Sequence, residues 1–210
     1  MSRVPWKEDK VISIETGSGI FVLAQMLRSP YLAIFDTFRT TNQWDDIYLD
    51  ALRVLFCKAV TRQFISCSNV QRQSIEPCHA IEYPRFWIEA NPETVLAVIW
   101  EGTPEERSVW VFGKNGGKLI ERDITLGGSQ NRKVIQWTIP FSDRETINRY
   151  ELTDIEVYPA FNERLYLCHA LGRKVDPMKE IIFRYPIPRE YERYLDIISG
   201  GNRARVTGFG

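Results

Sequence analysis

Two apolar segments joined by a tight turn place the strongest constraint on how this chain folds. Residues 19–27 (Gly-Ile-Phe-Val-Leu-Ala-Gln-Met-Leu) and 31–38 (Tyr-Leu-Ala-Ile-Phe-Asp-Thr-Phe) are rich in β-branched and aromatic side chains, which is typical of strands. The sequence Arg28-Ser29-Pro30 between them predicts a turn, because proline fixes φ and ends a strand. Such a hairpin must bury an apolar face, so neighbouring segments are expected to complete a small twisted sheet or barrel.

Similar patterns continue on both sides of the hairpin. Further strands are predicted at residues 11–15, 54–60, 84–89, 95–100, 109–112, 118–122 and 134–139. The spacing of Ser142 and Glu145 is that of a helix capping box, and Pro159 and Gly172 bracket a predicted helix. We therefore expect an α+β protein, with an N-terminal β-rich, barrel-like half and a C-terminal antiparallel meander carrying one or two packed helices.

A break in the pattern at Asn91-Pro92 marks the expected domain boundary. Residues 1–91 are predicted to form the β-rich half and residues 92–199 the α+β half, unless the two form one continuous domain. The Gly- and Arg-rich residues 200–210 are predicted to be a disordered tail.

The charge balance and the hydropathy pattern limit the kinds of partner and the cellular location that we expect. The chain has 27 basic and 27 acidic residues, so no net charge attracts it to nucleic acid or to an anionic membrane. Its apolar runs are far shorter than the roughly 20 residues that a spanning helix needs. The first ten residues are charged and lack the apolar core of a secretion signal, so a cytoplasmic protein is expected, with neither nucleic acid nor membrane as a partner.

The cysteines and histidines are the residues most able to carry chemistry. Two of the four cysteines precede the two histidines, in Cys78-His79 and Cys168-His169. A zinc site would need both pairs, yet consecutive side chains point apart. A thiol- or metal-dependent hydrolase using either pair remains an alternative, but no nucleophile elbow or phosphate-binding loop occurs. We therefore predict no catalytic residue, no metal ligand and no cofactor, and hence not an enzyme.

One loop combines acidic and aromatic residues in a way that suits recognition. It contains Trp44, Asp45, Asp46, Tyr48 and Asp50. Acidic and aromatic side chains together can bind a basic protein surface, and an exposed tryptophan would be the anchor of such an interface. These five residues are the predicted partner-binding site.

The first half also resembles a known family. Residues 19–24 (Gly-Ile-Phe-Val-Leu-Ala), 31–36 (Tyr-Leu-Ala-Ile-Phe-Asp), 54–60 (Val-Leu-Phe-Cys-Lys-Ala-Val) and the strand around Trp87 resemble the family numbered twenty-six among the immunity proteins of bacterial polymorphic toxins. The resemblance covers roughly residues 12–90. It implies a small β-rich domain that binds and neutralises a cognate toxin domain by occluding its active site, with no catalytic residues of its own.

This resemblance sets the leading expectation for function. The protein is expected to act in bacterial competition, including contact-dependent inhibition, as the binding half of a toxin–antitoxin pair. A non-catalytic adaptor subunit is a further alternative, which would equally lack reactive groups. The sequence gives neither the activity of the toxin, the face that binds it, nor the oligomeric state.

Overall fold

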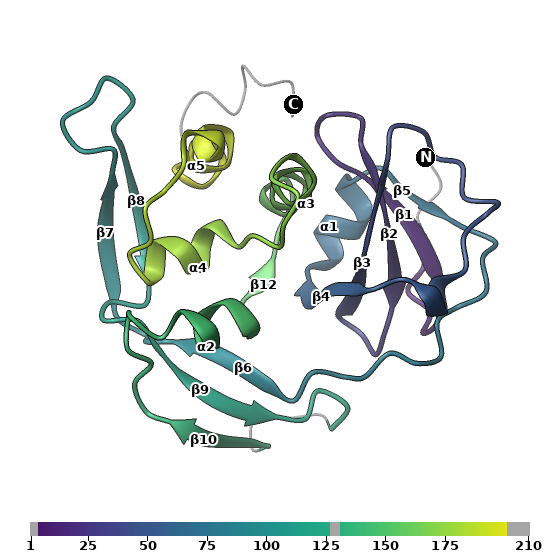
Figure 1. The fold of residues 1–210 in the computed structure, drawn as a ribbon, viewed down its shortest axis with the longest axis horizontal. Helices are drawn as coiled ribbons and strands as arrows, with labels where there is room; N and C mark the ends of the chain where they lie inside the picture. The colour runs from purple at the N-terminus through teal and green to yellow at the C-terminus, as the bar shows by residue number, and fades with distance from the viewer. Residues whose placement is uncertain (1–3, 127–130, 201–210) are drawn as a thin grey trace. The chain divides into compact units, whose positions relative to one another are not determined.

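The protein is described by a computed structural model that covers residues 4–126 and 131–200 (Figure 1). The chain divides into two compact units, each made of two segments. Unit 1 contains Met1–Pro84 and Asp154–Lys174, and unit 2 contains Arg85–Thr153 and Val175–Gly210. The boundary expected after residue 91 would instead divide the chain into two continuous domains. It stays a prediction for domains that fold independently. Of the predicted tail at residues 200–210, all but Gly200 lies outside the described residues.

Unit 1 is built on one six-stranded sheet. Its strands are β1 (Val11–Glu15), β2 (Phe21–Met26), β3 (Tyr31–Arg39), β4 (Val54–Val60), β5 (Val70–Arg72) and β12 (Ile155–Glu156). They lie in the order β12-β4-β3-β2-β1-β5, and only the pair β12 and β4 is parallel. The predicted hairpin is β2 and β3, at the centre of the sheet.

Two shifts in register bend this sheet. The pairing of β2 with β3 shifts between Val22 and Ala24, and that of β3 with β4 shifts between Ile34 and Phe35. An extra residue on one strand increases the local twist of the pair. The sheet is accordingly a curled half-barrel, which confirms the α+β class and the barrel-like N-terminal half.

Two helices and a single 3₁₀ turn complete unit 1. They are α1 (Arg62–Cys67), α3 (Ala160–Ala170) and η1 (Leu49–Ala51). Helix α3 is the helix predicted from Pro159 and Gly172, and it carries Phe161 into the core. The Phe161 ring centroid lies 6.2 Å from that of Phe56 and 5.0 Å from that of Phe64, both edge-on. Apolar packing therefore attaches the returning segment to the sheet.

A buried ion network fixes the same segment to β4. Lys58 has a fully buried side chain that pairs with Asp154 and lies 3.9 Å from the carboxylate of Glu156. Arg164 of α3 lies 2.6 Å from the same Glu156 carboxylate, and its guanidinium is 4.4 Å from the centre of the Phe56 ring. Taking a charge out of water costs several kcal/mol, so a buried cation requires such partners. The network thus couples β4, β12 and α3.

Unit 2 contains a four-stranded sheet and a separate hairpin. The sheet has the order β10-β9-β6-β11, from β6 (Phe86–Ala90), β9 (Gly117–Arg122), β10 (Arg132–Gln136) and β11 (Glu151–Leu152). The hairpin consists of β7 (Thr94–Ile99) and β8 (Arg107–Phe112). The antiparallel strands predicted for the second half are therefore present, but β9 pairs with β6 instead of continuing from β8. Gly113 and Gly116, both with positive φ, turn the chain between β8 and β9.

Short helices complete unit 2. They are α2 (Arg144–Arg149), α4 (Pro177–Ile182), η2 (Arg189–Tyr191) and α5 (Glu192–Ile198). The N-cap of α2 is Asp143, whose carboxylate accepts the Thr146 N–H at 3.1 Å, so the capping box predicted from Ser142 is displaced by one residue. Asp is as good an N-cap as Ser, because either side-chain oxygen satisfies a free amide. Among the described residues, every helix is too short or too polar to cross a membrane.

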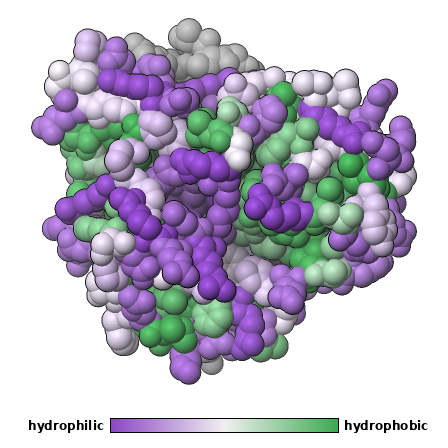
Figure 2. Space-filling model, in the orientation of Figure 1, coloured by the Kyte–Doolittle hydropathy of each residue, from purple (hydrophilic) through white to green (hydrophobic). Residues whose placement is uncertain are grey.

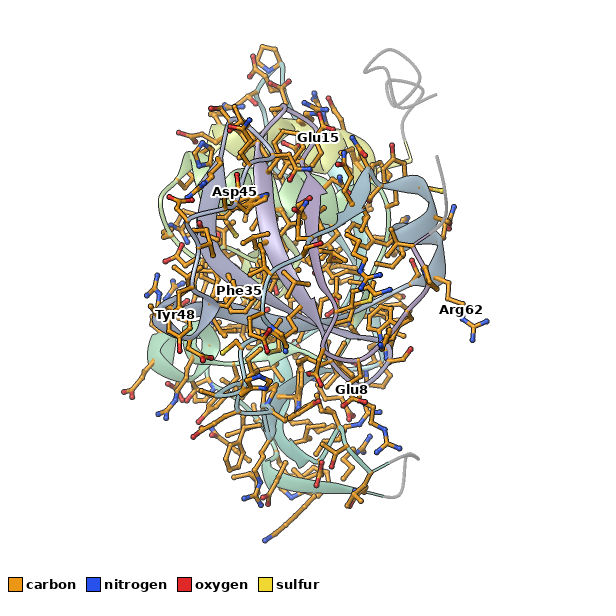
Figure 3. The ribbon with its side chains drawn as sticks, turned by 90° about the vertical axis from the view of Figure 1, so that its right-hand side faces the viewer. Glu8, Glu15, Phe35, Asp45, Tyr48 and Arg62 are labelled. Atoms are coloured by element: carbon orange, nitrogen blue, oxygen red, sulfur yellow. The ribbon has the colours of Figure 1, made fainter. Side chains whose placement is uncertain are left out.

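We predict that removing the charge of Arg164 destabilises the protein severely. The change Arg164→Met leaves the Glu156 carboxylate buried without one of its cations, and such losses cost about 3–5 kcal/mol. Urea denaturation followed by circular dichroism measures the loss. Arg62→Met is the matched control, because Arg62 is exposed at the start of α1 (Figure 3), and it should change the free energy of unfolding by less than about 0.5 kcal/mol. Equal effects of the two changes would contradict a stabilising role for the network.

Candidate functional site

The loop between β3 and β4 is anchored to the core of unit 1 by Trp44. This side chain is 3% exposed and packs in a cluster with Phe35 and Leu49. Its indole N–H donates to Asn42 Oδ1 at 2.6 Å, and the Arg39 guanidinium lies 5.0 Å from the centre of its ring. Trp44 is therefore a core residue and not the exposed anchor predicted for an interface. Burying its large ring stabilises the fold more than surface exposure would.

Arg39 gives the loop its shape. Its guanidinium donates to the Gln43 carbonyl at 2.6 Å and pairs with Asp46 at 2.9 Å while it covers the Trp44 ring. One cation at the end of β3 thus holds three successive parts of the loop. The loop is ordered by contacts within unit 1 and needs no partner to define its conformation.

The other predicted site residues lie on the outside of this loop. Asp45, Asp46, Tyr48 and Asp50 are all exposed, and we call these four residues the acidic loop surface. Figure 3 shows Asp45 and Tyr48 toward the same margin of unit 1, with Arg62 at the opposite margin. The structure therefore exposes four of the five predicted residues on this loop and buries Trp44.

The segment that follows β5 covers the core beside the loop. The side-chain amide of Gln25 is buried and bridges both backbone groups of Cys78: its oxygen accepts the Cys78 N–H at 2.8 Å, and its nitrogen donates to the Cys78 carbonyl at 3.1 Å. Cys78 itself belongs to the same core cluster as Trp44. The next residue, His79, donates its backbone N–H to Asp50 at 3.1 Å and so joins the segment to the loop.

These contacts keep the surface carboxylates ionised. The hydrogen bond from the Arg39 guanidinium holds the pKa of Asp46 below its usual range. The hydrogen bond from the Cys78 thiol, followed by those from the Tyr48 hydroxyl and the His79 N–H, lowers the pKa of Asp50. At neutral pH, both carboxylates carry full negative charge in fixed positions. The surface therefore suits a basic partner.

The same contacts make Cys78 a poor nucleophile. Burial raises the pKa of the Cys78 thiol above its ordinary value, and the neighbouring Asp50 carboxylate raises it further. A reactive cysteine needs the opposite shift, because the thiolate is the attacking form. The adjacent imidazole of His79 is exposed and lies 3.5 Å from Glu76.

The second Cys–His pair is divided between the two sides of α3. Cys168 is buried at 2% exposure, whereas His169 is exposed and its ring lies 5.3 Å from that of Phe38. Consecutive positions on a helix point about 100° apart, which accounts for the separation. Within residues 4–126 and 131–200, no group of three or more His, Cys, Asp or Glu side chains is arranged to hold a metal ion.

Sequence patterns did not predict the residues that organise this region. Arg39 and Gln25 fix the loop and the adjoining segment, and Lys58 anchors the segment that returns at β12. One signal for Lys58 was present, since it is a single charge in a strand that is otherwise apolar on both faces. Gln25 carries a similar signal, since it is the single polar residue in the apolar run of residues 20–27. Arg39 carries none, because arginine is common on strand surfaces.

The fold and this surface define an α+β protein with a curled sheet and an ordered, negatively charged loop. The chain belongs to the family described as a domain of unknown function, DUF8309, whose profile matches residues 1–186. The match includes all of unit 1 and the strands of unit 2. The searches of curated proteins and of solved structures found no match.

The thiols should differ sharply in reactivity. Cys67 is the exposed cysteine, while Cys57, Cys78 and Cys168 are buried. With a disulfide reagent at neutral pH, we expect Cys67 to react at least about tenfold faster than Cys78, whose raised pKa suppresses the thiolate. Peptide mapping by mass spectrometry assigns each rate, and Cys67→Ser should abolish the fast phase. Rapid modification of Cys78 or Cys168 in the native protein would contradict this account and favour the hydrolase.

Proposed function

We propose that the protein is an immunity protein that binds a cognate bacterial toxin domain and neutralises it stoichiometrically. The observation that carries the proposal is the acidic loop surface, in which exposed carboxylates stand on a loop fixed to the core. Occlusion of the toxin's active site or substrate path would then need only binding. The resemblance over residues 12–90 supports the same role and falls mostly on the sheet of unit 1.

The chemistry of the surface indicates the kind of toxin face that it would bind. The lowered pKa values keep Asp46 and Asp50 ionised, and Asp45 is an exposed acidic residue of the same loop, so a basic face is complementary. Toxin domains that act on nucleic acid carry basic clefts, because they must bind phosphates. An acidic loop that enters such a cleft would exclude the substrate directly. We place this activity in the cytoplasm, where the target of an imported toxin would lie.

The two alternative functions, a hydrolase and an adaptor subunit, require different features of the protein. A hydrolase that uses Cys78 requires an accessible thiolate, which the raised pKa of this thiol opposes. An adaptor subunit makes no demand on reactive groups, so only its partner distinguishes it from an immunity protein. The neighbouring genes separate these functions, since an immunity gene is expected directly downstream of the gene for a large secreted toxin.

Co-expression is the direct test of the proposal. The toxin domain encoded by the upstream neighbour should arrest growth of a host cell, and the protein should restore growth and co-purify with the toxin. Rescue without co-purification, or no rescue at all, would contradict neutralisation by binding.

Charge reversal at Asp45 tests the proposed surface. Asp45 is exposed and lies beside the Arg39–Asp46 pair, so Asp45→Lys should leave the fold intact. We expect affinity for the toxin to fall at least about tenfold, chiefly through slower association, and this loss to shrink at high salt. Surface plasmon resonance measures both rates.

The matched control for this variant is Glu101→Lys. Glu101 is an exposed carboxylate in the β7–β8 turn of unit 2, so its reversal changes the net charge equally. It should leave the association rate within about twofold of the native value. Equal losses for both variants would indicate a general charge effect and remove the acidic loop surface from the proposal.

A further inference from the structure

The β7–β8 hairpin of unit 2 exposes an unusual amount of apolar surface. Its outward face carries Leu96 and Val98 from β7 and Trp110 and Phe112 from β8, with exposed fractions between 43% and 72%. Leu96 and Trp110 are directly opposed in the register of the hairpin. Figure 2 shows hydrophobic side chains gathered over β7 and β8, at the left of the view. Exposed apolar groups of this size commonly mark interaction sites.

Strand β7 also has an open edge. Within the described residues, its sheet contains only β7 and β8, so the side of β7 that faces away from β8 pairs with no strand. An edge strand presents backbone N–H and C=O groups that can pair with an added strand. Native proteins usually protect such edges with charges, proline or a bulge. The five residues from Val95 to Ile99 include no charged residue and no proline, and their pairing with β8 is regular, without a bulge.

A groove runs along the whole of this strand. Its volume is about 470 Å³, and its walls include every residue from Val95 to Trp100. The opposite wall is formed by Ile181 and Ile182 of α4 and by Ile187 beyond it. Helices α4 and α5 contact β8, the partner strand of β7. A strand added at β7 would bury apolar side chains against these isoleucines.

Close packing fixes both ends of the groove. At one end, Gly113 has φ +100°, and a Cβ at this position would lie 2.7 Å from the side chain of Ile182. Only glycine allows α4 to approach the hairpin this closely. At the other end, the Trp100 indole donates to the Ile187 carbonyl at 2.9 Å, and the Arg189 guanidinium lies 4.5 Å from the centre of its ring. The groove is thus held open by contacts within unit 2.

The charged lining of the groove has one sign. Its basic residues are Lys114 and Arg184, and the described residues that line it include no carboxylate. Lys114 follows β8 and bonds through its backbone N–H to the Glu93 carbonyl, so it lies beside the start of β7. Arg184 has its guanidinium 4.9 Å from the centre of the Phe141 ring and is exposed. Both cations favour an occupant that carries negative charge.

We propose that the open edge of β7 binds an extended acidic peptide segment of a partner protein as a third strand. Backbone hydrogen bonds to β7 supply part of the affinity, as in other complexes formed by strand addition. Alternating apolar side chains of the segment lie on one face and fill the groove. Carboxylates of the segment pair with Lys114 and Arg184. This site is separate from the acidic loop surface, so it does not depend on the proposed toxin-neutralising function.

The charge of the groove argues against the chain's own C-terminal residues as the occupant. Residues 201–210 include Arg203 and Arg205 and contain no acidic residue. Placing them beside Lys114 and Arg184 would bring like charges together, which is unfavourable. An acidic segment from another protein is the better match.

A displayed peptide library tests the proposal without a known partner. The full-length protein is immobilised and used to select from phage carrying random 12-residue peptides. We expect enriched peptides in which apolar residues alternate and Asp or Glu is over-represented. Hydrogen exchange with the best synthetic peptide should slow the amides of Val95–Ile99 at least tenfold. Failure to enrich any such peptide, or protection confined to other segments, would overturn the proposal.

Variants of the cations supply the matched comparison. The double change Lys114→Glu and Arg184→Asn should weaken the selected peptide at least tenfold, and asparagine tolerates the left-handed backbone at position 184. Lys133→Glu is the control, because Lys133 is an exposed cation on β10 outside the groove, and it should change the affinity by less than twofold. Equal weakening by both would overturn the assigned charge recognition.

Two other occupants give distinct results in the same experiments. If sedimentation shows a dimer of the protein alone, and dimerisation protects the β7 amides, the edge belongs to a second copy of the chain. If peptides are enriched only after residues 201–210 are deleted, the C-terminal residues occupy the open edge of β7. Either result overturns the proposal of an acidic peptide from a partner protein.

Discussion

The arrangement of the chain depends on how one buried cation is neutralised. Lys58 lies in the middle of β4, and the carboxylates that balance its charge belong to Asp154 and Glu156, which follow in sequence only after the strands of unit 2. Arg164 completes the network from α3. A lysine left without these partners in the core would cost several kcal/mol, so the sheet of unit 1 is complete only when the later segment returns. Unit 1 therefore contains residues from both sides of the segment that forms the strands of unit 2.

The balanced charge of the whole chain conceals two local surfaces of opposite sign. In unit 1, the acidic loop surface is held by inward-facing Trp44 and Cys78, so its carboxylates are positioned before any partner arrives. In unit 2, the groove along β7 is lined by Lys114 and Arg184. An ordered binding surface loses less conformational entropy on association than a flexible one. This order supports our proposal that both surfaces bind macromolecules.

Sequence patterns predicted the elements of this fold better than their connections. The bounds of β1 and β4 follow directly from runs of β-branched and aromatic residues, and α3 follows from its terminal proline and glycine. The return of α3 to unit 1 could not be predicted, because it depends on contacts between residues about a hundred positions apart. Trp44 was named as an interface anchor on the condition that it is exposed, because polar residues surround it in sequence. It is buried instead, with Arg39 over its ring and Asn42 accepting its N–H. The carboxylates around it are exposed, as expected for charged residues in a loop.

We propose that the protein acts by binding one toxin molecule and not by turnover. Titration of a fixed amount of the toxin domain with increasing protein tests this most directly, with residual toxin activity as the readout. The account predicts a linear loss of activity that ends at one protein per toxin, together with a complex of the same ratio in sedimentation. Complete inactivation at a small fraction of one equivalent would contradict it, because only a catalyst can inactivate many toxin molecules in succession.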